Sequence, residues 1–184
     1  MQEPKLQPPI DAAAVLAEWE SRETLLRGRI REIGVSRPEQ VAHLTGLQML
    51  EAGLAGELPA APIFKTLDFL LVEVTKGRAV FQGRPLERHY NPLGGVHGGW
   101  FATLLDSAVG CAVHSTLEVG RGYTTAELKI NIVRPLTDKT PLVRAEGLFI
   151  HLGRRMATAE ARMTGPDGKL YAHATTTCFL FDTP

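Results

Sequence analysis

The residues best suited to chemistry lie between positions 91 and 110, in the stretch NPLGGVHGGWFATLLDSAVG. His97, Gly98 and Gly99 stand where a glycine-rich turn is predicted to become a helix. The first N–H groups of a helix have no partner within it and carry partial positive charge, and glycine lets another group approach that backbone closely. We therefore predict that the Gly98 N–H polarises a carbonyl oxygen that gains negative charge, as in an oxyanion hole, although a tight turn alone also demands small residues here.

The same predicted helix carries one acid, Asp106. Its neighbours are almost all apolar, and a carboxylate in such surroundings is costly unless it is paired or used. A structural acid in a salt bridge is the alternative, but the glycine turn ahead of the helix favours a catalytic carboxylate. Asp106 follows Gly98 by eight residues, or about 12 Å along a helix. A substrate held at Gly98 therefore needs a bent path, or a second subunit, to meet Asp106.

The composition is that of an ordinary globular protein. The chain has 184 residues, 44% of them hydrophobic and 22% charged, which predicts one domain with a sizeable core. Lys plus Arg and Asp plus Glu both number 20, so the net charge gives no support for binding to nucleic acid or to a membrane surface.

The two cysteines and the start of the chain bear on cofactors and location. Cys111 and Cys178 fall in apolar segments without metal-ligand spacing, so we expect free buried thiols and no metal or other cofactor. The first residues lack the apolar core of a secretory signal, and no run of about 18 apolar residues predicts a membrane span. We expect a cytoplasmic protein.

The order of the predicted elements indicates the fold class. Residues 1–60 are predicted to form a helical extension with helices near 11–33 and 36–56, and residues 61–184 a second unit. In that unit the residues around Thr75 to Arg78 predict a hairpin, residues 97–117 a buried helix, and residues 121–135, 141–153, 154–165 and 169–181 four strands. Two strands, one buried helix and four strands imply an α+β fold in which an antiparallel sheet wraps around a long central helix.

These features resemble the phenylacetate-degradation-type acyl-CoA thioesterases of the hotdog fold, within the 4-hydroxybenzoyl-CoA thioesterase superfamily. The resemblance rests on Asn91, on His97-Gly98-Gly99 and on an acid eight residues after the first glycine. It continues through GYTTAELKINIVRP (122–135) and GRRMATAEARM (153–163), and covers about residues 62–181.

The resemblance implies roles for particular residues. Asp106 would attack the thioester or activate water, with the choice left open, and the Asn91 amide would orient water or the substrate carbonyl. His97 would position the oxyanion hole, where Gly99 also contacts the substrate. Thr125, in preference to Thr124, would hold the water. The Asn and the acid of one site would come from different subunits, as a dimer or a homotetramer built from two dimers.

Arg154 and Arg155 follow Gly153 at a turn between two predicted strands. A solvated turn is the common reason for such a pair. The alternative is contact with the phosphates of coenzyme A, which suit the forked geometry of arginine.

We therefore expect hydrolysis of an aryl-, short-chain or medium-chain acyl-CoA to free acid and CoA. A module that binds or senses acyl-CoA without turnover is the alternative, but it has no need of the acid at Asp106. A hydratase of the same fold and a purely structural oligomer are further alternatives. The sequence does not identify the acyl group; Leu93, Trp100 and Phe101 are weak candidates to line its pocket, and core packing is the stronger explanation for them.

Overall fold

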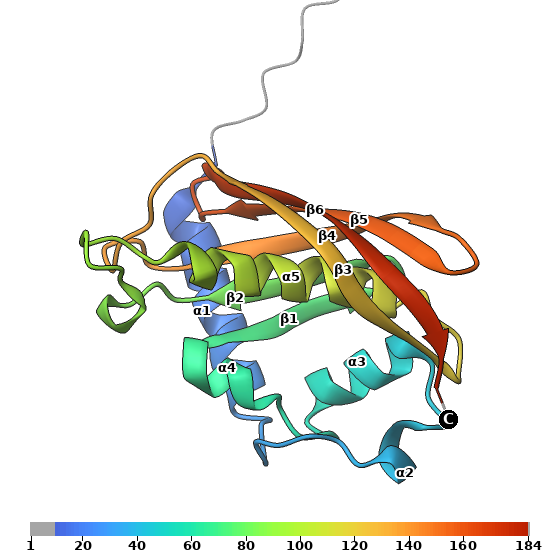
Figure 1. The fold of residues 1–184 in the computed structure, drawn as a ribbon. Helices are drawn as coiled ribbons and strands as arrows, with labels where there is room; N and C mark the ends of the chain where they lie inside the picture. Colours follow the sequence, from blue (N-terminus) through green and yellow to red (C-terminus); the bar gives the residue numbers. More distant parts are fainter. Residues whose placement is uncertain (1–9, 184) are drawn as a thin grey trace, which may run out of the picture.

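The computed structural model describes residues 10–183 (Figure 1). Four helices precede the sheet: α1 (Ala12–Arg27), α2 (Pro38–Val41), α3 (Gly46–Ala55) and α4 (Pro62–Leu67). The remaining elements are β1 (Phe69–Thr75), β2 (Arg78–Gly83), the 3₁₀ turn η1 (Glu87–His89), α5 (Gly98–His114), β3 (Arg121–Ile132), β4 (Val143–Leu152), β5 (Met156–Thr164) and β6 (Leu170–Asp182).

One antiparallel sheet holds all six strands, in the order β1-β2-β4-β5-β6-β3. The sheet curves around α5, which lies across its concave face (Figure 1). Most residues of α5 are buried, including the fully buried Leu104, Leu105, Ala108 and Val109, because the strands enclose more than half of its circumference. The predicted hotdog architecture is thus confirmed.

The distance between α5 and the sheet depends on a glycine in β4. A Cβ atom added at Gly147 would lie 2.2 Å from the carbonyl oxygen of Ala108. The backbones of β4 and α5 therefore touch, which only a residue without a side chain permits. This contact fixes the height of α5, and with it Asp106, above the sheet.

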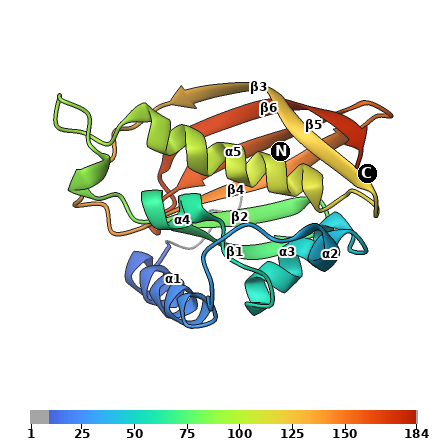
Figure 2. The ribbon, with the colours of Figure 1, turned by 60° about the horizontal axis from the view of Figure 1, so that its bottom comes forward.

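The N-terminal helices pack on two sides of the β1–β2 hairpin. Leu26 of α1 joins Leu70, Val72 and Val80 in an apolar cluster on the face of the hairpin that points away from α5, so α1 lies on the outer side in Figure 2. Around this cluster, Arg144 Nε donates to Gln82 Oε1 at 2.9 Å, and its guanidinium lies 4.5 Å from the centre of a Trp19 ring. The helical extension is therefore tied to the sheet by both apolar and polar contacts.

Helix α3 packs on the other side, next to α5. The Gly46 N–H at its start donates to the carbonyl of Leu117 at 3.0 Å, just beyond the end of α5. Leu50 and Leu54 of α3 and Phe64 of α4 pack against the main core. The extension therefore lengthens the core beyond the edge of the sheet.

The two edges of the sheet differ. At β1, Arg22 of α1 donates from Nε and Nη2 to the Val72 carbonyl at 3.2 and 3.0 Å, and α3 and α4 pack alongside. At the other edge β3, a strand of 12 residues, pairs only with β6 among the described residues. Unpaired backbone groups of such an edge can pair with another strand.

The helices of the extension differ from the sequence prediction in length and number. The first ends at Arg27, followed by Gly28, whereas the prediction carried it to residue 33. The second is interrupted at Thr45, whose hydroxyl accepts from the Gln48 N–H and begins α3. Helix α4 is absent from the prediction. It starts at Pro62, and Asp68, which has a left-handed φ of 54°, caps its C-terminal end after Leu67.

Candidate active site

The predicted glycine turn and helix start are present as expected. His97 is the N-cap of α5: its Nδ1 accepts a hydrogen bond from the Gly99 N–H at 2.8 Å, and its own N–H donates to the His89 carbonyl at 2.8 Å. Gly98 is exposed, and its N–H has no acceptor within residues 10–183. His97 therefore fixes the turn and leaves the Gly98 N–H, at the positive end of the helix, open to a ligand.

Asn91 shapes the loop ahead of this turn. Its side-chain oxygen accepts from the N–H groups of Leu93 and Gly95 at 2.9 and 3.5 Å, which holds the loop in a tight turn. The amide NH₂ of Asn91 has no such contact in the described part of the chain. That group is the one available to meet a carbonyl oxygen or a water.

Asp106 and Thr125 are in direct contact. The Thr125 hydroxyl donates to Asp106 Oδ1 at 2.9 Å, from β3 to α5. Thr124, one residue earlier on the strand, is exposed, because successive side chains of a strand point to opposite faces. Of the two threonines, Thr125 is thus the one beside the acid, and Asp106 is only partly buried, so substrate can reach its second oxygen.

Tyr123 is a neighbour of this pair that the sequence analysis did not single out. Its hydroxyl would lie 2.7 Å from a Cβ added at Gly110, so its ring covers the helix one turn after Asp106. Two spacings in the sequence bear on this position. Tyr123 precedes Thr125 by two residues and so shares its face of the strand, and Gly110 follows Asp106 by four residues and so shares its face of the helix.

The cysteine beside Tyr123 is unreactive. Burial, with the nearby Asp106 charge, raises the pKa of the Cys111 thiol to about 12, which leaves it protonated at neutral pH. Burial likewise raises the pKa of Cys178. The thiolate is the nucleophilic form of cysteine, and burial disfavours it at both positions.

The other predicted residues lie apart from Asp106. Asn91 lies in the loop before α5, and His97, Gly98 and Gly99 stand at the first turn of that helix, whereas Asp106 lies about two turns further along it. Arg154 and Arg155 are exposed in the turn between β4 and β5, at the end of the sheet near Leu117. Of the weak pocket candidates, Leu93 is 94% exposed, while Trp100 and Phe101 belong to the core.

Neither a metal-binding cluster nor a membrane-spanning helix is found among residues 10–183. No group of three or more His, Cys, Asp or Glu side chains there is arranged to hold a metal ion. None of the helices in the same range has the length and apolar character needed to cross a bilayer.

Comparison with known proteins identifies the family. The Saccharolobus solfataricus protein named "Putative esterase SSO2140" is 34% identical over 125 residues, which cover 67% of this chain and 86% of that protein. The family model described as Thioesterase superfamily matches residues 93–172, from the glycine turn into β6. The chain belongs to the thioesterase superfamily. It is a thioester hydrolase with the hotdog fold, of the phenylacetate-degradation type.

Two further relatives agree with this assignment. A 1,4-dihydroxy-2-naphthoyl-CoA hydrolase from Listeria monocytogenes is 28% identical over 106 residues, which cover 58% of this chain and 85% of that enzyme. The crystal structure of a phenylacetic acid degradation-related protein from Ralstonia eutropha superposes with a TM-score of 0.64 and 28% identity, covering 74% of this chain and 99% of that one. The family model begins at residue 93, so the N-terminal helices lie outside the residues that it matches.

Proposed function

We propose that this thioesterase hydrolyses acyl-CoA thioesters to the free acid and CoA, at two sites that a pair of subunits share. The observation that carries the proposal is the contact of Thr125 with Asp106, a half-buried carboxylate held on one oxygen and free on the other. The Listeria relative, named as a CoA-thioester hydrolase, supports the substrate class.

In the proposed reaction the Gly98 N–H donates to the thioester carbonyl oxygen and stabilises the negative charge that develops on it. With Asp106 as general base, a water attacks the carbonyl carbon while the carboxylate takes its proton. The tetrahedral intermediate then collapses, the C–S bond breaks, and the proton passes from Asp106 to the CoA thiolate. With Asp106 as nucleophile, the carboxylate itself attacks the carbonyl carbon, and the C–S bond breaks to release the CoA thiolate and leave a mixed anhydride. Water then hydrolyses the anhydride to the free acid and the Asp106 carboxylate, and the proton released neutralises the thiolate. Thr125 orients the carboxylate in either route, and the Asn91 amide orients the water or the carbonyl.

Two features support the proposed sharing of sites between subunits. Asp106 is eight residues from Gly98 on the same helix, which is about 12 Å. The edge of β3 carries unpaired backbone groups beside Thr125, and an isologous pairing there would set two α5 helices side by side. Asp106 of one subunit would then face the glycine turn of the other. We propose a dimer, or a homotetramer made of two such dimers.

The CoA phosphates have a suitable basic region at one end of the sheet. Lys76, Arg121 and Arg154 line a surface hollow there, and Arg155 is exposed next to it. Arg121 Nη2 donates to the Arg154 carbonyl at 3.0 Å, which steadies the turn. We propose that Arg154 and Arg155 contact the phosphates, where forked guanidinium groups bind well. The cytoplasm is the proposed location, in keeping with two free cysteines.

The deciding experiment measures thiol release from a panel of aryl- and straight-chain acyl-CoAs by wild type, by Asp106→Asn and by Glu160→Gln, an exposed acid of β5 that serves as control. We expect turnover by wild type and the control, and a loss of at least about 10²-fold in kcat for Asp106→Asn. Tight acyl-CoA binding without turnover by wild type would instead indicate the binding and sensing module. Equal turnover by wild type and Asp106→Asn would show that the catalytic acid lies elsewhere.

A further inference from the structure

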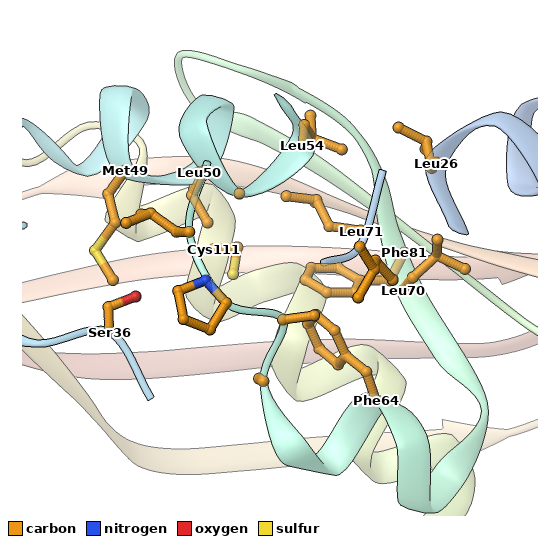
Figure 3. Close-up of a pocket in the computed structure, with 16 residues that line it drawn as sticks. Leu26, Ser36, Met49, Leu50, Leu54, Phe64, Leu70, Leu71, Phe81 and Cys111 are labelled. Atoms are coloured by element: carbon orange, nitrogen blue, oxygen red, sulfur yellow. The ribbon is translucent and has the colours of Figure 1, made fainter. Parts of the chain in front are cut away.

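A partly open apolar cavity lies where the N-terminal helices meet the hotdog unit (Figure 3). Its volume is about 250 Å³. Helix α3 contributes Met49, Leu50 and Leu54 to its wall, and Phe64 of α4 closes another side. Its lining is apolar apart from Ser36 and Cys111, so it suits an apolar occupant and not a charged one.

The cavity reaches the helix that carries the proposed catalytic acid. Cys111 is the residue of α5 that lines it. Cys111 follows Asp106 by five residues, which is about 7.5 Å along the helix axis and about 140° around it. Gly110 is buried beneath the ring of Tyr123, so the half-buried Ser107, four residues before Cys111, is the part of the helix surface over which an acyl chain would pass from Asp106 to the cavity.

We infer that this cavity receives the acyl tail of the thioester, so that the N-terminal helices set the chain-length specificity. The inference rests on the proposed function, because it takes the reacting carbonyl to lie at Asp106. The charged and polar CoA moiety would remain outside, toward the exposed arginines. The N-terminal extension thereby becomes part of the substrate site, although it lies outside the residues that the family model matches.

The volume limits the length of the tail. An apolar cavity of about 150 Å³ holds a benzene ring, or six carbon atoms, so a volume of 250 Å³ corresponds to about ten carbons. We therefore assign medium-chain acyl groups, near decanoyl, as the preferred aliphatic substrates. Longer tails would have to displace the wall formed by α3.

Gly53 offers a way to narrow the cavity. It lines the cavity, and a Cβ atom added to it would meet nothing within 4 Å. Gly53 is exposed and therefore stands at the rim of the cavity, so Gly53→Leu adds a branched side chain that narrows it there, and a leucine within α3 is favoured over glycine by helix propensity. Ala55→Leu adds a similar side chain on the exposed side of the same helix and is the matched control. Met49→Ala makes the opposite change, because it enlarges the cavity.

The experiment measures kcat/KM for acyl-CoAs from C4 to C16. We expect a wild-type optimum near C10, and in Gly53→Leu a loss of at least tenfold for decanoyl-CoA with butyryl-CoA changed by less than twofold. Met49→Ala should move the optimum to longer chains, and Ala55→Leu should keep the wild-type profile. An active enzyme whose chain-length profile is the same in Gly53→Leu and Ala55→Leu would overturn the inference.

A binding measurement separates this inference from the proposed function. Titration calorimetry with decanoic acid needs no turnover, and we expect heat of binding with wild type and Ala55→Leu but not with Gly53→Leu. If no acyl-CoA is hydrolysed while this pattern holds, the proposed function fails and the cavity remains a site for an apolar tail. If acyl-CoAs are hydrolysed and decanoic acid binds equally to all three proteins, the cavity assignment fails alone.

Discussion

At the residue scale, the decisive contact is the hydrogen bond from Thr125 to Asp106. A hydroxyl has one proton to donate, and Thr125 gives it to Oδ1 at 2.9 Å. That oxygen is thereby oriented, while Oδ2 remains free to accept a proton or to attack. In the proposed reaction Thr125 would act through the carboxylate, as a positioning residue.

Replacing Thr125 tests this role. Thr125→Val keeps the shape of the side chain and removes the donor, so kcat should fall about tenfold, in line with one hydrogen bond to a charged group. KM should change by less than threefold, because the substrate keeps its own contacts. Thr124→Val, on the opposite face of the strand, is the control and should retain wild-type kcat. Equal losses in the two variants would indicate a general effect on β3.

A second residue-scale prediction concerns pH. Burial lowers the pKa of His114 and of His89, since an interior site disfavours the charged ring. The unfolded chain binds protons at about pH 6.5 while the folded chain does not, so the histidine contribution to stability is constant at high pH and is lost as pH falls below about 6.5. His114→Phe should reduce the loss of urea stability between pH 8 and pH 5, and an unchanged loss would contradict this account.

The sequence indicated the elements that carry the glycine turn and the acid, but not which side chains lie beside them. Asp106 and the glycine turn stand out because an acid in an apolar helix and a run of glycines are unusual in a local stretch of chain. The choice between Thr124 and Thr125 needed the register of β3 against α5, which no local pattern contains. Tyr123 was overlooked because its spacing to Thr125, and that of Gly110 to Asp106, become informative only once β3 is known to pack on α5.

At the scale of elements, the contact between β4 and α5 sets the geometry of the site. Gly147 allows the two backbones to touch at Ala108, two residues after Asp106. A side chain at Gly147 would push α5 away from the sheet and separate Asp106 from Thr125. The strength of this constraint can be measured by comparing two glycines.

Gly147→Ala and Gly53→Ala make the same chemical change with opposite expected results. The added methyl group at Gly147 overlaps the Ala108 carbonyl and should lower the free energy of unfolding by about 1–3 kcal/mol. At Gly53 it meets open space within a helix and should raise that free energy by about 0.5–1 kcal/mol. Urea unfolding followed by circular dichroism gives both values. A neutral Gly147→Ala would mean that α5 shifts without cost.

The predicted elements were most accurate where the periodicity was long and local. The hairpin and the later strands match the alternation of apolar residues, and α5 matches the long apolar stretch that predicted a buried helix. The N-terminal helices were predicted too long because their ends depend on contacts beyond the sequence pattern. Ile33, expected in the first helix, instead bridges to Ala60 in a parallel pair, and Gly46 donates across to Leu117.

At the scale of the whole molecule, the shared site predicts that two inactive variants restore each other. Asp106→Asn removes the carboxylate, and Asn91→Asp removes the amide NH₂ while keeping an oxygen for the loop. If each site draws Asp106 from one subunit and Asn91 from the other, a mixed dimer has one site with both changes and one intact site.

Random pairing of equal amounts, after dissociation and reassociation, should therefore restore about a quarter of wild-type thiol release in a dimer with isologous sites. Each variant treated alone in the same way is the control and should stay inactive. No recovery in the mixture, with mixed dimers detected by native mass spectrometry, would place the whole site within one chain.

The asymmetry between the two edges of the sheet has a consequence for how far copies can assemble. Arg22 donates to the Val72 carbonyl on β1, and the helices α3 and α4 flank that strand. The outer edge of β3 has no partner strand among the described residues. A subunit with only one free sheet edge can pair with one other copy. Edge-to-edge growth of this sheet stops once two copies have joined, so the exposed β3 can nucleate a pair but cannot propagate a fibre.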